Sequence, residues 1–327
     1  MNLARVEQIA KAVLYEGYML YPYRPSSVKN RQRFNFGVLY PEAFCDAQEG
    51  SDPCSMRTEC LIRGNRQTMV EARLRFLHLH IRLRRGSALP ERWQEAVERE
   101  ICLPECSLGD LCERQMTHTF AFLVPKGGID FTRGLSSAED EFKQESVEGV
   151  MEVSAQELRD DLFKMSVKVR NTTPLESSTF NRDAALMHSL VSTHTVLGVT
   201  AGEFISLLEP SQDLEDLAAS CQNVGAWPVL VGDPGESNTL LASPIILYDY
   251  PQIAPESSGD LFDGTEIDEI LSLRIMTLTD QEKQEMRQSD ERARRILERT
   301  ESMPAEQFMK LHGVVRTLRP LGEETHE

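Results

Sequence analysis

The spacing of apolar residues changes along the chain, and each change predicts a different kind of element. Residues 3–14 carry apolar side chains at helical intervals, which predicts an amphipathic N-terminal helix that ends near Glu16. Residues 68–85 alternate instead, and the apolar parity switches partway, so we expect a long strand with a bend or bulge. Further strands are expected at 116–124, 147–153 and 163–173, followed by a hairpin around residues 201–202.

Other stretches favour loops or helices. Residues 42–66 are polar, contain three cysteines and are expected to form an irregular loop. Residues 89–101 suggest a short helix with Pro90 in its first turn. Near the C-terminus, Thr279 and Glu282 have the spacing of a capping box, which predicts a long helix that reaches about residue 300.

Strands therefore precede helices along the chain rather than alternating with them. Roughly seven to nine strands followed by a helical end predict an α+β fold rather than a doubly wound parallel sheet. We expect an antiparallel β-sandwich or curled sheet with an N-terminal helix and a helical C-terminus. The expected division is a mostly β core over residues 1–262 and a helical segment over residues 263–327 that packs on it.

Charge is distributed unevenly and limits the choice of partners. The net charge is −17, yet residues 1–100 hold 16 Lys and Arg against 12 Asp and Glu, whereas residues 101–327 hold 19 against 40. The negative field of that larger part disfavours nucleic acid and anionic membranes as partners. Charges at Arg5, Glu7 and Lys11 interrupt the apolar core that a signal peptide needs, so we expect a cytoplasmic protein without membrane insertion. Seven cysteines, an odd number, are expected to be mostly thiols.

One N-terminal segment concentrates aromatic and basic side chains. Residues 15–40 hold five of the seven tyrosines, with no acidic residue between Glu16 and Glu42. Tyrosine and arginine together favour a recognition surface, because the ring gives rigid apolar area and the guanidinium pairs with carboxylates or stacks on rings. The alternative is a packed loop whose tyrosines anchor it to the core.

A second segment is its electrostatic complement. Residues 248–269 contain the other two tyrosines and seven acidic residues but no Lys or Arg. The basic segment is therefore expected to dock on the acidic one, within one molecule or across a dimer, or to bind a protein partner. The residues expected to bind are Tyr21, Tyr23, Arg24, Lys29, Asn30, Arg31 and Arg33, together with Asp249, Asp260 and Asp263.

Catalytic and metal-binding patterns are weaker. Cys102, Cys106 and Cys112 lack the tight two-residue spacing of a zinc or iron–sulfur knuckle, with Cys45, Cys54 and Cys60 as further possible ligands. We therefore assign no catalytic residue, metal ligand or cofactor. Two alternatives stay open: a metal-assisted hydrolase using His78, His80 or His188 with carboxylates of residues 249–268, and a thiol or iron–sulfur redox protein using the three cysteines. His188 and His194 are six residues apart, which is not the spacing of a metalloprotease pair.

The segments YMLYPYRPSSVKNRQRFNFGVLYP and SPIILYDYPQIAPESSGDLFDGTEIDEILSLRIMTLTDQEK also carry a family resemblance. They resemble a bacterial protein family that has no assigned activity and is encoded in gene clusters with nickel–iron hydrogenase structural and maturation genes. The resemblance carries over no catalytic residue. It implies a non-enzymatic accessory or interaction protein that binds a hydrogenase subunit or maturation factor.

Overall fold

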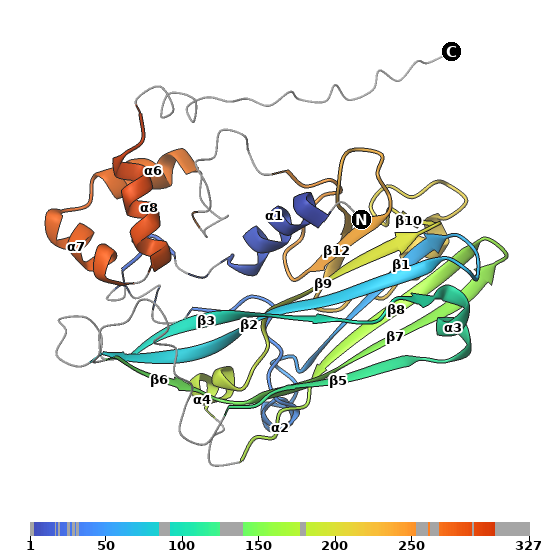
Figure 1. Ribbon diagram of the computed structural model, residues 1–327, viewed down its shortest axis with the longest axis horizontal. Coiled ribbons are helices and arrows are strands. Elements are labelled where there is room, and N and C mark those ends of the chain that lie inside the picture. The colour runs from blue at the N-terminus through green and yellow to red at the C-terminus, as the bar shows by residue number, and fades with distance from the viewer. Residues whose placement is uncertain are drawn as a thin grey trace.

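The computed structural model confirms the predicted α+β class, with two antiparallel sheets and helices at both ends of the chain (Figure 1). The structure describes residues 3–16, 18, 20–24, 27, 30, 33–84, 92–124, 140–176, 181–252, 261, 268–289 and 291–304. No helix within these ranges is both long and apolar enough to cross a membrane.

The first sheet has five strands, and its neighbouring strands are antiparallel. Their order across the sheet is β10 (Glu203–Ile205), β1 (Ser55–Arg63), β8 (Leu162–Asn171), β7 (Val147–Arg159) and β5 (Met116–Phe122). The expected loop over residues 42–66 is therefore wrong, because β1 lies at positions 55–63 and the short helix α2 (Glu42–Ala47) precedes it. In β1, Arg57, Glu59 and Arg63 alternate with the buried Met56, Cys60 and Ile62, so the period of a strand is present in the sequence.

The second sheet has seven strands built around β2 (Met69–Arg84). Its main order is β11 (Trp227–Leu230), β12 (Thr239–Ser243), β9 (Val191–Thr200), β2 and β3 (Arg92–Cys102), with β4 (Cys106–Ser107) and β6 (Asp140–Gln144) also paired to β2. The predicted irregularity of β2 is confirmed, because its register with β9 shifts between Arg75 and Leu77. The pairing of β9 with β2 ends at Leu77↔Val191, and β6 pairs with β2 from His80 onward.

The helix expected at residues 89–101 is also wrong where the structure describes it, because residues 92–102 form strand β3. β3 pairs with β2 from Leu83↔Arg92 to Arg73↔Cys102. Glu98 and Glu100 are exposed, whereas Arg99 and Ile101 are less so, which is the period of a strand. The long β2 presents backbone groups that need partners, and this pairing outweighs the local helical propensity of the segment.

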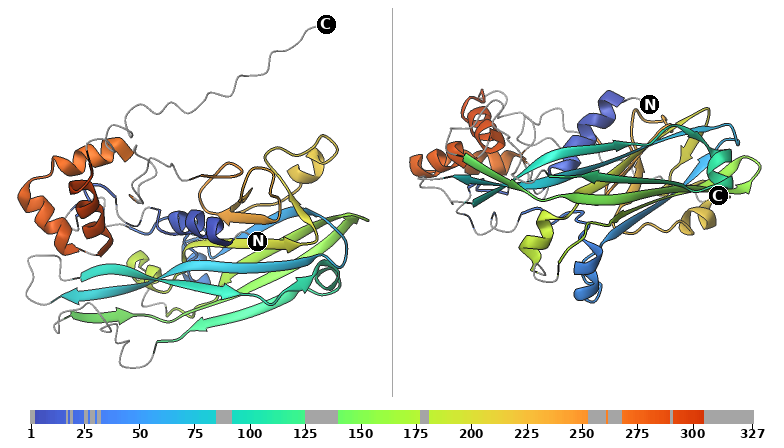
Figure 2. Two further views of the ribbon diagram at one scale, coloured as in Figure 1. Left: turned by 45° about the horizontal axis from the view of Figure 1, so that its top comes forward. Right: turned by 60° about the horizontal axis from the view of Figure 1, so that its bottom comes forward.

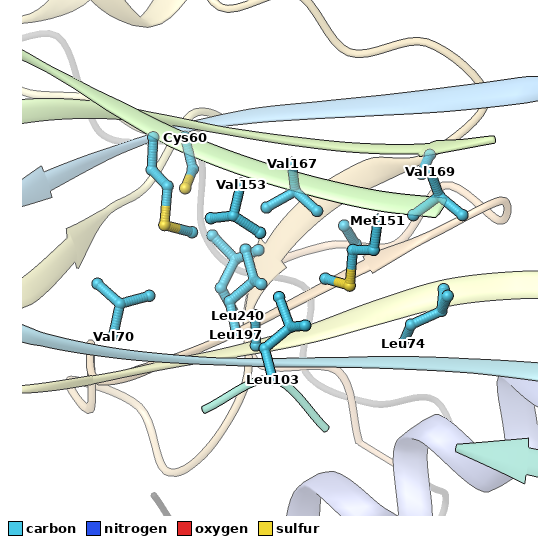
Figure 3. Packing of buried hydrophobic residues seen from close by; sticks show 14 of the residues in the cluster. Cys60, Val70, Leu74, Leu103, Met151, Val153, Val167, Val169, Leu197 and Leu240 are labelled. Carbon is cyan, nitrogen blue, oxygen red and sulfur yellow. The ribbon is translucent and has the colours of Figure 1, made fainter. Parts of the chain in front are cut away.

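The main core lies between the two sheets (Figure 3). Both sheets contribute alternate side chains to it, as expected where strands bury one face each. The residues labelled in the figure are Cys60, Val70, Leu74, Leu103, Met151, Val153, Val167, Val169, Leu197 and Leu240.

Helices from both termini lie on the side of the seven-stranded sheet that faces away from the main core. Helix α1 (Leu3–Leu14) packs its apolar face on Val196 and Leu241, which confirms the predicted N-terminal helix. Helices α6 (Asp268–Met276), α7 (Asp280–Ser289) and α8 (Glu291–Glu301) gather beyond one end of the sheets (Figures 1 and 2). The predicted capping box is present, since the Glu282 carboxylate accepts from Thr279 N at 2.8 Å. The remaining short helices are α3 (Leu108–Glu113), α4 (Arg182–Met187) and α5 (Glu215–Ala219).

Candidate functional site

The tyrosine-rich N-terminal segment forms a buried layer between the seven-stranded sheet and the C-terminal helices. We call Tyr15, Tyr18, Tyr23 and Phe34 the aromatic layer; all four are buried. They share one apolar cluster with residues of β2 and of all three C-terminal helices. Those neighbours are Leu77, Leu79, Ile81, Leu271, Ile275, Met286, Ile296 and Leu297.

Two arginines stack on the rings of the aromatic layer. Arg33, only 4% exposed, lies 5.4 Å from the Tyr18 ring centre and 5.1 Å from that of Phe34, and donates to the Gln94 carbonyl. Arg292 of α8 lies 3.9 Å from the Tyr15 ring centre and 5.1 Å from that of Tyr18. Cations over aromatic faces are attracted by the ring quadrupole, and more strongly when water is excluded. Arg33 from the N-terminal segment and Arg292 from α8 thus both stabilise the aromatic layer.

Three predicted binding residues of this segment, Tyr23, Arg24 and Asn30, make further contacts within the chain. The Tyr23 hydroxyl donates to the Leu261 carbonyl at 2.7 Å, just before α6. The Asn30 side-chain amide accepts from Leu20 N at 2.9 Å and donates to Leu20 O at 2.8 Å, which joins positions 20 and 30. Arg24 reaches α7, where it lies 3.0 Å from Glu282 and 3.9 Å from Glu285. The segment therefore docks on the C-terminal region of its own molecule.

Not every predicted binding residue enters this layer. Tyr21 and Arg24 stay partly exposed, whereas Tyr23, Asn30 and Arg33 are buried. Lys29, Arg31, Asp260 and Asp263 lie outside the described residues.

Asp249 lies elsewhere and fixes a turn. Its carboxylate accepts from the Ser206 hydroxyl at 2.5 Å and from Leu230 N at 2.7 Å, which joins the end of β11 to the chain after β10. Ser206 Oγ in turn accepts from Glu209 N at 2.9 Å. These contacts give Asp249 a structural role as an acceptor.

The histidines of the hydrolase alternative do come together. His78 and His80 lie on β2. Both His80 and His188 lie close enough to His78 to lower its pKa. Burial, with smaller contributions from Arg99 and these two imidazoles, lowers the pKa of His78 to about 4. His80 Nε2 lies 3.3 Å from the Glu95 carboxylate.

Both ring nitrogens of His78 are already engaged. Nε2 lies 2.7 Å from the Glu145 carbonyl and must carry the proton to donate there. Nδ1 is then the acceptor for Arg99 Nε at 3.4 Å. A neutral imidazole with both nitrogens committed is poorly suited to act as a general base.

His194 does not belong to that cluster. It lies on β9 opposite Arg75 of β2, with Nδ1 2.9 Å from the Ser192 carbonyl. Burial lowers its pKa to about 4. Across the described part of the chain, no three His, Cys, Asp or Glu side chains are placed so that they could hold a metal ion.

The three predicted redox cysteines lie on β3, β4 and α3. Cys102 is exposed and its thiol donates to the Glu100 carboxylate at 3.4 Å. Burial raises the pKa of Cys102, Cys106 and Cys112, which keeps the thiol form dominant.

Helix α6 carries an exposed apolar face that the sequence reasoning missed. Ile270, Leu273 and Met276, 37%, 44% and 50% exposed, recur at helical spacing; we call them the α6 stripe. The opposite side, Leu271 and Ile275, is buried against the aromatic layer. The available signal was that α6 is apolar on more than one face, which a helix buried on one side does not need.

The α6 stripe adjoins one predicted binding residue. Arg274 of α6 lies 5.5 Å from the ring centre of Tyr21, so that ring and the exposed helix are neighbours. A comparison with models of known protein families finds no match, and a comparison with curated proteins finds none either.

Proposed function

We propose that this protein is a non-enzymatic accessory protein that binds a protein partner through the α6 stripe and the adjoining Tyr21. The observation that carries the proposal is the apolar exposed face of a helix whose other face is buried. An exposed row of large apolar side chains costs solubility, and in soluble proteins such rows commonly mark interaction sites. A few well-packed residues contribute most of the binding energy of a protein interface, and tyrosine is among the residue types enriched there.

Buried contacts anchor the helix that carries the α6 stripe. Leu271 and Ile275 fix α6 to the aromatic layer, which itself packs on β2. Arg24 joins the N-terminal segment to α7 through Glu282. A surface that is already ordered loses little entropy on binding, so a partner gains more of the contact energy.

The charge of the neighbouring sequence indicates what kind of partner fits. Residues 248–269 lead into α6 with seven acidic residues and no basic one. A complementary partner is an amphipathic helix with apolar side chains at three- and four-residue intervals and Lys or Arg beside them. The family resemblance makes nickel–iron hydrogenase subunits and maturation factors the first partners to test.

The committed nitrogens of His78 support a binding role over hydrolysis. Glu145 and Arg99 occupy both nitrogens, and Asp249 is engaged by Ser206 and Leu230. The histidine cluster therefore fits a structural role at the point where β6 replaces β9 beside β2.

The proposal is tested by charge substitution within the stripe. Leu273→Asp and Met276→Asp should each weaken binding to the purified hydrogenase partner by at least about tenfold, since an apolar anchor is worth 1.4 kcal/mol or more. Isothermal titration against individual hydrogenase subunits and maturation factors measures this. Leu208→Asp, at a similarly exposed position after β10, is the matched control and should bind as the wild type does.

Circular dichroism must first show that each variant is folded. Unchanged affinity in folded Leu273→Asp and Met276→Asp variants would reject the α6 stripe. Absence of binding to every hydrogenase component would reject that partner class.

A further inference from the structure

Two cysteines lie side by side at the base of the turn that follows α2. Cys45 belongs to α2, and Cys54 directly precedes β1. Cys54 packs against the apolar cluster that contains Cys45, and it lies near enough to help raise the pKa of Cys45. The backbone of Tyr40 joins the two arms, since Tyr40 N donates to Pro53 O at 2.8 Å and Tyr40 O accepts from Cys45 Sγ at 3.8 Å.

Both arms are anchored to the rest of the fold. Asn171 N of β8 donates to the Cys54 carbonyl at 3.0 Å. On the α2 side, Glu42 lies 2.9 Å from Arg170, also of β8. The segments that carry the two cysteines are therefore both held by β8, and their proximity does not depend on the turn between them.

The two thiols differ in their access to solvent. Cys45 is 4% exposed, whereas Cys54 is only partly buried. Burial, helped by the neighbouring Cys54 and Asp52, raises the pKa of Cys45 to about 12. Cys54 is thus the thiol that an external reagent can reach, and Cys45 is the buried thiol that can resolve a mixed disulfide on Cys54.

We propose that Cys45 and Cys54 are a redox-active pair that closes to a disulfide in reaction with a small-molecule disulfide such as oxidised glutathione. This modification site goes beyond the proposed binding function and does not depend on it.

The reaction balances as two exchange steps. The Cys54 thiolate attacks one sulfur of oxidised glutathione, whose S–S bond breaks and releases one glutathione thiolate. The Cys45 thiol then gives its proton to water or to that thiolate, and its sulfur attacks Cys54 Sγ in the mixed disulfide. The second glutathione leaves, so two protein S–H groups become one S–S bond and one glutathione disulfide is reduced to two thiols.

Another neighbouring pair of thiols provides an internal comparison. Cys60 is fully buried, and Cys221 lies near enough to help raise its pKa. The Cys221 thiol, however, donates to the Leu217 carbonyl at 3.6 Å. Burial raises the pKa of Cys221 to about 11, so little of it is the thiolate that attacks a disulfide, and this second pair should stay reduced.

The experiment is thiol mapping of the full-length protein after oxidation. Cys45 and Cys54 fall in one tryptic peptide, residues 34–57, so their disulfide appears as the loss of two hydrogens from that peptide. The protein is incubated with oxidised glutathione, denatured, alkylated with iodoacetamide and digested for mass spectrometry. We expect alkylation of five cysteines instead of all seven, and recovery of all seven after dithiothreitol.

Single substitutions separate the two roles. Cys45→Ser should retain glutathione on Cys54 as a stable mixed disulfide, whereas Cys54→Ser should show neither the bridge nor that adduct. Cys221→Ser is the matched control and should form the bridge as the wild type does. Alkylation of both Cys45 and Cys54 in oxidised wild-type protein, or a persistent Cys54–glutathione adduct in it, would overturn the proposal, and this wild-type measurement holds even if a variant fails to fold.

Discussion

Buried histidines give single residues of this protein a measurable effect on its stability. His78 and His194 are neutral in the folded protein because burial lowers the pKa of each to about 4. In the unfolded chain the same imidazoles bind protons near pH 6.5. Because the pKa of each imidazole differs between the folded and unfolded chain, the free energy of unfolding depends on pH.

The sign of the His194 effect follows from proton counts. Between pH 6.5 and about 4 the unfolded chain binds a proton that the folded protein does not, so the free energy of unfolding falls as the pH falls. At pH 4.5 the loss from this residue is on the order of 2 kcal/mol. Urea unfolding at pH 7 and pH 4.5 should show a drop smaller by about that amount in His194→Gln than in wild type.

The comparison of pH values separates titration from packing. A substitution in the core lowers stability at both pH values, but only loss of the titrating group changes the difference between them. His118→Gln on the edge strand β5, where the side chain is partly exposed, is the control and should follow the wild type. An identical pH dependence in wild type and His194→Gln would contradict the prediction.

Among the elements, strand β7 shows how closely the first sheet is packed. β7 lies between β5 and β8, and Gly149 pairs with Phe120 on one side and Asn171 on the other. A Cβ at position 149 would lie 2.4 Å from Phe120 Cζ and 3.0 Å from the Arg170 carbonyl oxygen. The Phe120 ring also packs on Phe76 of the opposite sheet, with 5.9 Å between ring centres.

Gly149→Ala should therefore destabilise the protein by about 1–3 kcal/mol, because the ring of Phe120 has to leave its place in the core. Urea unfolding measures the loss. A double-mutant cycle with Phe120→Leu is the control: if the ring causes the cost, the alanine should cost clearly less in the leucine background. Equal costs in both backgrounds would assign the effect to the backbone of β7 or to Arg170 O instead.

Elements with a strong local pattern could be predicted from sequence, and those shaped by their neighbours could not. The alternation of β2 and its change of parity were visible because its apolar side chains face the main core in the first half and the aromatic layer in the second. In β3 the charged residues Glu98 and Glu100 occupy positions that also suit a helix. One partner that both share is Arg75 on β2, 3.9 Å and 3.3 Å away, which the chain order alone does not reveal.

For the whole molecule, the sequence indicated which segments matter but not how they are arranged. The concentration of tyrosines and arginines was evident, and it marks a real structural layer. That this layer is covered by helices of the same chain depends on contacts such as Tyr23–Leu261, separated by 238 positions. The exposed α6 stripe was missed for the same reason, since the buried face of α6 is defined only by the layer beneath it.

These contacts predict that the C-terminal helices are not a separable domain. Five of their apolar side chains, Leu271, Ile275, Met286, Ile296 and Leu297, are buried in the cluster that contains the aromatic layer. Burial of each contributes roughly 1.5–3 kcal/mol, so together they rival the 5–15 kcal/mol by which a typical domain is stable. Removing the helices would also expose Tyr15, Tyr18 and the outer face of β2 to water.

A chain of residues 1–252 should therefore bind the dye ANS, lose near-ultraviolet circular dichroism and unfold at a lower urea concentration than the full chain, if it folds cooperatively at all. A chain of residues 1–304 keeps α6, α7 and α8 and is the control, which should match the full-length protein. If residues 1–252 instead unfold cooperatively at the full-length midpoint without binding ANS, the sheets form an independent domain. The aromatic layer would then be stable without the C-terminal helices. Its contacts with Arg292 would stabilise the position of α8 and not the sheets.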